Sequence, residues 1–81
     1  MSWNRLDPGL QEAIAAALTP AQLEAFTLEL AGYGSRAIAQ ALDLSRSSVL
    51  SRLENAHRKL LHAGLRQDGS GRWHLEEARP S

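Results

Sequence analysis

The sequence predicts a mainly α-helical domain of four helices that ends in a small β-hairpin. Ala and Leu supply 27 of the 35 hydrophobic residues, whereas Val, Ile and Thr together number five, and this composition favours helix over strand. Apolar residues recur at helical spacing through most of the chain, and short alternating runs follow Gly64. A chain of 81 residues is one domain that hides about 60–65% of its unfolded surface. We expect a small core within residues 7–75.

The first predicted helix covers roughly residues 8–17. Asp7 is a typical N-cap, and Pro8 occupies the first turn, where its missing N–H costs nothing. Leu10 and Ile14 share one face, and the other sides are rich in Ala. This helix should therefore pack closely against a neighbouring helix.

The second predicted helix begins after Thr19. The sequence Thr19-Pro20-Ala21-Gln22 has the pattern of a capping box, and Gly32 is a typical C-terminal stop. We expect Glu24 and Glu29 to face water and Tyr33 to pack at the joint that follows. The core stripe of this helix should consist of apolar residues, namely Leu23, Phe26, Leu30 and Ala31.

Residues 35–63 have the pattern of a helix-turn-helix, with helices at about 35–42 and 46–63. Asp43 between them is a residue type that tolerates a left-handed backbone. Ser45 is a plausible N-cap for the second helix, which Gly64 closes. The buried face should consist of small and aliphatic residues, namely Ile38, Ala39, Leu42, Leu44, Val49, Leu53, Ala56 and Leu60.

This run resembles the promoter-reading helix-turn-helix at the C-terminal end of bacterial sigma factors (region 4), and it is also similar to the DNA-binding domain of LuxR-type regulators. The resemblance covers roughly Leu18 to Leu61, about half of the chain. It implies that the second helix of the motif binds double-stranded DNA. Two positions depart from the pattern: Leu50 stands where both families usually hold a basic residue, and Ala37 where they often hold an acidic one.

The predicted recognition helix supplies the candidate contact residues. In a helix-turn-helix, the first residues of the second helix reach base edges and later ones approach the backbone. The base-reading candidates are Arg46, Ser47, Leu50 and Ser51. The phosphate candidates are short hydroxyls and long cations at the groove edges, namely Arg36, Ser45, Ser48, Arg52 and Arg58. The alternative for each residue is an ordinary solvated helix face.

Residues 65–75 have the composition of a β-hairpin. Two alternating runs, 65–67 and 73–75, flank the turn sequence Asp68-Gly69-Ser70-Gly71. Placed after a recognition helix, the hairpin resembles the wing of winged helix-turn-helix proteins, with Trp73 and Leu75 packed inward and Arg66 or Arg72 free to contact phosphate. The alternative is a flexible tail that Trp73 pins to the core. We expect residues 76–81 to be a disordered tail.

Charge is unevenly distributed although the net charge is zero. Residues 1–32 carry one basic and four acidic side chains, or −3, whereas residues 33–66 carry six basic and two acidic ones, or +4. Residues 67–81 add two basic and three acidic ones, or −1. Positive charge is therefore concentrated on the predicted helix-turn-helix, which favours modest non-specific affinity for nucleic acid.

Several classes of function lack a sequence signal. The chain has no cysteine, hence no disulfide and no thiolate metal site, and we expect a reducing cytoplasm. No membrane segment is evident, because the longest purely apolar run is Ala13 to Leu18. His57 and His62 are five apart and point in different directions, so they do not form a metal pair. We expect no enzyme activity and no cofactor.

Two functions compete. The first is a sequence-specific transcriptional regulator that binds double-stranded DNA as a homodimer, because one recognition helix reads only a few base pairs. The face of the first helix around Leu10 and Ile14, and the wing around Trp73, are the surfaces we expect to be available for dimerisation. The second is a sigma-like interaction module that contacts RNA polymerase or another regulator, a reading that the neutral net charge and Leu50 encourage.

Overall fold

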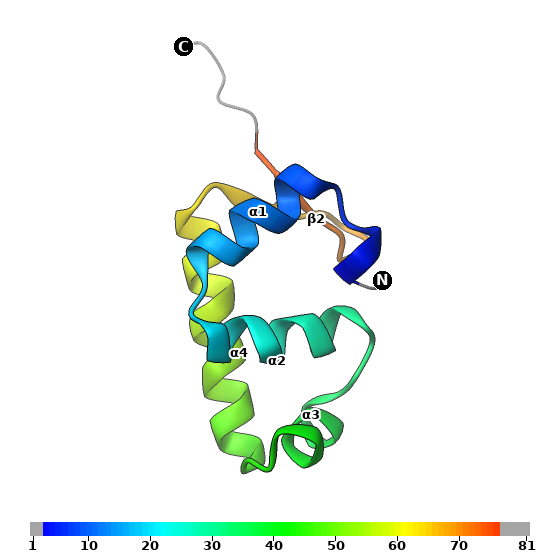
Figure 1. The fold of residues 1–81 in the computed structure, drawn as a ribbon, viewed down its shortest axis with the longest axis vertical. Coiled ribbons are helices and arrows are strands. Elements are labelled where there is room, and N and C mark those ends of the chain that lie inside the picture. Colours follow the sequence, from blue (N-terminus) through cyan, green and yellow to red (C-terminus); the bar gives the residue numbers. More distant parts are fainter. Residues whose placement is uncertain (1–2, 77–81) are drawn as a thin grey trace.

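The computed structural model describes residues 3–76 and confirms the predicted fold class (Figure 1). A short 3-10 helix precedes four α-helices, and two antiparallel strands follow them: η1 (Trp3–Arg5), α1 (Pro8–Ala17), α2 (Pro20–Leu30), α3 (Ser35–Leu42), α4 (Arg46–His62), β1 (Leu65–Gln67) and β2 (Trp73–Leu75). In Figure 1, α4 runs along the long axis and α2 crosses it, with α3 at one end and α1 and the hairpin at the other. No helix within the described residues is both long enough and apolar enough to span a bilayer.

Side-chain caps start α1 and α2 where the sequence predicts. The Asp7 carboxylate accepts from the N–H of Gly9 at 3.0 Å. At α2, Oγ1 of Thr19 accepts from the N–H of Gln22 at 3.2 Å, while Oε1 of Gln22 accepts from the N–H of Thr19 at 3.1 Å. These bonds satisfy N–H groups that a helix start otherwise leaves unpaired. Both boundaries are therefore local properties of the sequence.

The turn between α3 and α4 is built on Asp43, whose backbone is left-handed with φ 55° and ψ 49°. This conformation lets the N–H of Leu44 donate back to the carbonyl of Ala39 at 2.9 Å, which closes α3. Oγ of Ser45 then accepts from the N–H of Ser48 at 3.1 Å and starts α4. The predicted helix-turn-helix is thus present in residues 35–62.

The core has two parts that share α4. The first half of α4 contributes Val49 and Leu53 to a cluster with α3 and α2, and the second half contributes Ala56 and Leu60 to a cluster with α1 and the hairpin. The members of the α3 cluster are Ala25, Ile38, Ala39, Val49 and Leu53. The members of the other are Leu6, Leu10, Ile14, Leu18, Phe26, Ala56, Leu60, Leu65 and Trp73. One face of α4 is therefore buried along its length, and the opposite face is exposed.

Burial in this core corrects the expectation that the first helix offers an apolar face for dimerisation. Leu10 and Ile14 are buried within the chain itself, and Leu6, just before the expected core boundary, is buried with them. The reason is that α2 and α4, together with the buried hairpin side chains Leu65 and Trp73, already cover this side of α1.

The hairpin packs on the helices and is not a tail. Its strands pair with Leu65 opposite Leu75 and Gln67 opposite Trp73. Trp73 is buried and meets the Phe26 ring edge-on, with ring centroids 5.8 Å apart. The expectation that Leu75 also packs inward is wrong, since this side chain is 45% exposed. Its strand partner Leu65 fills the core position, and Leu75 is left at the rim.

Pairing extends beyond the predicted hairpin. The N–H of Glu76 donates to the carbonyl of Gly64 at 2.9 Å, and Oε2 of Glu76 lies 3.2 Å from Nη2 of Arg66. Glu76 therefore belongs to the hairpin, although the predicted tail begins there. The remainder of that tail, 77–81, lies outside the described residues.

Asp68 organises the hairpin turn. Its Oδ1 accepts from the hydroxyl of Ser70 at 2.6 Å, from the N–H of Ser70 at 2.9 Å and from the N–H of Arg72 at 3.0 Å. The hydrogen bond from the Ser70 side chain, followed by that from the Arg72 backbone, holds the pKa of Asp68 below its ordinary value. The turn is thus stabilised by the ionised carboxylate.

Three expectations near the end of α2 are wrong. Ala31 is exposed because α2 ends at Leu30, and the left-handed Gly32 (φ 99°) turns the chain outward. Tyr33 is consequently 49% exposed and does not pack at the joint. Glu29 does not face water freely, because its carboxylate is half-buried against α4.

Candidate nucleic-acid interface

The outward face of α4 begins at its first turns. Val49 and Leu53 are buried on the inner side, whereas Ser47, Leu50 and Ser51 are exposed. Leu50 is 50% exposed, so it is not a core residue. Three of the predicted base-reading residues thus share one open helical surface, and the first turns of α4 make no side-chain bonds to the hairpin or to α1 within the described residues.

Arg46, the fourth base-reading candidate, is held at one side of this surface. Its Nε donates to Oγ of Ser35, the first residue of α3, at 3.0 Å. Both residues are exposed or half-exposed, and the terminal guanidinium nitrogens have no partner within the described residues. Ser35 therefore orients the guanidinium along the α3–α4 joint, and sequence reasoning missed it because the two residues are far apart in the chain.

The predicted phosphate candidates Ser45 and Ser48 belong to the cap of α4. Oγ of Ser45 donates to Oγ of Ser48 at 2.8 Å and lies 3.3 Å from Oγ of Ser47. All three hydroxyls are on exposed residues at the helix start. They form a small polar cluster whose oxygens are already partly engaged, so each retains fewer free hydrogen-bonding directions than an isolated serine.

A polar groove runs beside this cluster, between α4 and the start of α2. It has a volume of about 490 Å³ and is lined by Thr19, Ala21, Gln22, Ser47, Ser48, Ser51, Arg52 and Asn55, all of which except Ala21 carry a hydroxyl, amide or guanidinium group. The groove brings together four predicted contact residues. Sequence reasoning missed Thr19, Gln22 and Asn55, because the only signal of Thr19 and Gln22 was their capping box.

The two remaining predicted phosphate contacts, Arg36 and Arg58, differ in whether they have side-chain partners. Arg36 is exposed on α3 and has no side-chain partner within the described residues. Nη2 of Arg58 lies 3.4 Å from Oε1 of Glu54, and its Nη1 donates to Oδ1 of Asn55 at 3.4 Å. Arg58 is thus partly neutralised by its own helix, which weakens its case as a phosphate contact.

On the hairpin, the two arginines that the sequence offers as phosphate contacts differ. Nη1 of Arg66 donates to the carbonyls of Leu61 and Leu65 at 2.9 and 2.7 Å, and its Nη2 pairs with Glu76. Arg66 is therefore engaged in contacts within the fold and is not the free arginine of the two. Arg72 is exposed and makes no side-chain hydrogen bond or ion pair within the described residues.

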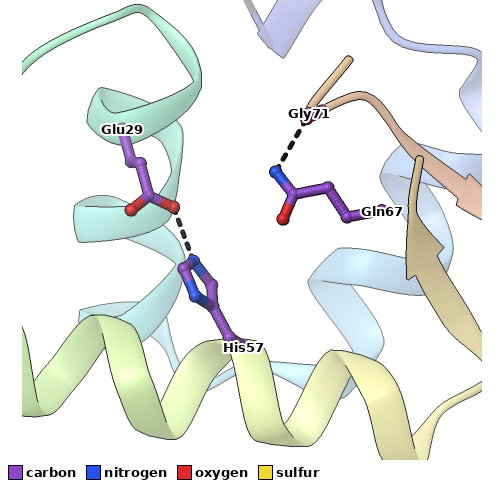
Figure 2. Close-up of polar contacts among 4 residues, drawn as sticks. All are labelled: Glu29, His57, Gln67 and Gly71. Atoms are coloured by element: carbon purple, nitrogen blue, oxygen red, sulfur yellow. Dashed lines mark hydrogen bonds and ion pairs between the residues drawn. The ribbon is translucent and has the colours of Figure 1, made fainter. Parts of the chain in front are cut away.

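A second cleft lies on the side of α4 that faces the hairpin. Its volume is about 380 Å³, and Glu29, His57, Gln67 and Arg72 are among the residues that line it. Figure 2 shows the Glu29–His57 pair on one side and Gln67, bonded to the carbonyl of Gly71 at 2.8 Å, on the other. Among the described residues, no group of three His, Cys, Asp or Glu side chains is placed to hold a metal ion.

Comparisons with known proteins gave no matching family model, no similar curated protein and no similar solved structure. The interpretation of the interface therefore rests on its geometry and charge.

Proposed function

We propose that the protein binds double-stranded DNA with α4 in the major groove, as a small cytoplasmic transcriptional regulator. The observation that carries the proposal is the open surface of the first turns of α4, with Ser47, Leu50 and Ser51 exposed and Arg46 beside them. An α-helix fits the major groove, where short hydroxyls and guanidinium groups reach base edges. The turn at Asp43 and the two core clusters that share α4 hold this surface in place.

Charge on both sides of the surface supports the same proposal. Arg36 is exposed on α3, and Arg52 of α4 lines the groove between α4 and the start of α2. Cations placed around a recognition helix hold the phosphate backbones and fix the register of the helix. Since residues 33–66 carry +4, we expect modest affinity that falls steeply with salt.

Fluorescence anisotropy with a labelled random-sequence duplex at several salt concentrations tests binding. We expect Arg52→Ala to weaken binding and to reduce the salt slope by about one unit. Arg5→Ala is the matched control, because Arg5 is an exposed arginine outside the interface. Equal loss from both variants, or no binding at low salt, would contradict the proposal. Selection from the random pool then tests for a preferred site.

One observation favours a second function. Leu50 is 50% exposed in the middle of an otherwise polar surface, and apolar side chains at such a position are typical of protein contacts. In this alternative, α4 contacts RNA polymerase or another regulator. Retention of host RNA polymerase by the immobilised protein, lost in Leu50→Ser and kept in Ser51→Ala, together with no measurable DNA binding, would favour it over the first.

A further inference from the structure

One edge of β2 pairs with no other element in the described part of the chain. The N–H of Asp68 donates to the carbonyl of Arg72, and the N–H of Glu76 donates to the carbonyl of Gly64. Hydrogen-bonded and non-hydrogen-bonded pairs alternate along an antiparallel ladder, so Arg66 and His74, midway between these two pairs, also form a hydrogen-bonded pair. The N–H and C=O groups of Trp73 and Leu75 must then point away from β1. Within the described residues no other element bonds to them. This edge offers backbone donors and acceptors to an incoming strand.

A cleft with an apolar wall lies along that edge. It has a volume of about 340 Å³; the apolar wall consists of Leu6, Leu10, Trp73 and Leu75, and the other four lining residues are charged or polar. The first three are buried, whereas Leu75 is 45% exposed at the rim. The cleft therefore combines free backbone groups with an apolar wall, which is the combination that strand addition uses.

We propose that the occupant of this edge is the β2 strand of a second copy of the chain, paired antiparallel about a two-fold axis at His74. In this register Trp73 of each copy lies opposite Leu75 of the other, and these are the residues whose N–H and C=O groups point outward. Both such pairs are then hydrogen-bonded pairs. Successive side chains of a strand point to opposite faces, so Leu75 of the second copy lies on the inner face and points toward the cleft beside Trp73.

Charge complementarity between the two copies supports a second copy of the chain as the partner strand. The same register sets Arg72 of each copy opposite Glu76 of the other, on the outer face of the sheet. Arg72 is exposed without a side-chain partner within the described residues, and the Glu76 carboxylate is 55% exposed beside Arg66. Opposite charges in directly facing positions stabilise an antiparallel pair, and the symmetry supplies this contact twice. The inference does not depend on DNA binding.

A cysteine at the axis tests the register directly. His74 would face His74 of the second copy as a non-hydrogen-bonded pair, with Cα atoms about 4.5 Å apart, which is within disulfide range. The chain has no other cysteine. We expect His74→Cys to form a covalent dimer under mild oxidation, and Ser70→Cys, exposed in the turn of the same hairpin, to form far less. Equal cross-linking of both variants, or none of His74→Cys, would overturn the proposal.

Sedimentation of the full chain without DNA, over a wide concentration range, provides the second test. We expect a monomer–dimer equilibrium that Arg72→Glu weakens and that the swap Arg72→Glu with Glu76→Arg restores. Leu75→Pro removes an N–H that points away from β1, so it should leave the hairpin paired and weaken association by about tenfold or more. Trp fluorescence checks that the hairpin remains folded. A monomer at every concentration, or a dimer that these changes leave intact, would refute the interface.

Discussion

Nε2 of His57 on α4 lies 2.6 Å from Oε1 of Glu29 on α2, and the His57 ring also contacts the Phe26 and Trp73 rings. This one side chain therefore links α4, α2 and the hairpin, and Figure 2 shows its contact with Glu29. Because α4 carries the exposed surface at its first turns, the contact at its middle contributes to the orientation of that surface relative to α2 and the hairpin.

Breaking this contact should lower stability modestly. The His57 and Glu29 side chains are 36% and 32% exposed, so solvent screens the pair, and we expect Glu29→Gln to lower the free energy of unfolding by about 1 kcal/mol. Glu24→Gln on the exposed side of the same helix is the control and should change little. Urea unfolding measures both. Equal effects of the two substitutions would mean that the contact contributes no net stability.

Arg46→Ala and Arg52→Ala should weaken DNA binding in different ways. If Arg46 contacts a base, its loss costs about 1–3 kcal/mol on the preferred site and relaxes sequence preference there, whereas loss of Arg52 weakens all sequences alike. Ser35→Ala removes the acceptor of the Arg46 Nε hydrogen bond. It should weaken binding to the preferred site in the same way as Arg46→Ala, but by less. Titrations against selected and random duplexes distinguish these outcomes. Parallel losses on both duplexes would show that Arg46 contacts phosphate.

Leu50→Lys separates the two proposed functions. Because Leu50 is exposed, we expect a change in the free energy of unfolding within about 0.5 kcal/mol, and stronger non-specific DNA binding from the added cation. A melting curve and a titration at two salt concentrations measure both quantities. Unchanged DNA binding with loss of polymerase retention would favour the protein-contact function.

The hairpin turn should loosen in acid. Since hydrogen bonds lower the pKa of Asp68 in the folded chain, its ionised form stabilises the hairpin above the ordinary value of 3.8, and that contribution is lost as pH falls through the lowered pKa. Trp73 fluorescence in a Trp3→Phe background should report this transition. Asp68→Asn should remove the pH dependence of the signal in that range. A transition that persists unchanged in Asp68→Asn would assign it to another carboxyl group.

The elements themselves were predictable because their signals are local. The caps at Asp7, Thr19 and Ser45 act across two or three residues, and the left-handed turn at Asp43 is formed by bonds that span a few positions. The repeat of Val49, Leu53 and Leu60 likewise identified the buried side of α4. Such features depend on the neighbouring sequence, so they can be derived without knowing how the helices cross.

The partners of exposed and half-buried polar groups depended on the tertiary structure. Residue types allowed Glu29 to face water and Leu75 to be buried, and both expectations failed once the helices and the hairpin packed together. The position of Thr19 and Gln22 beside Arg52, like the contact between Ser35 and Arg46, follows from the crossing of α2 and α3 with α4. The sequence alone determined which residues form helices and which helix faces are apolar. The packing of those faces determined which remaining side chains meet, because crossing geometry arises from contacts between residues far apart in the chain.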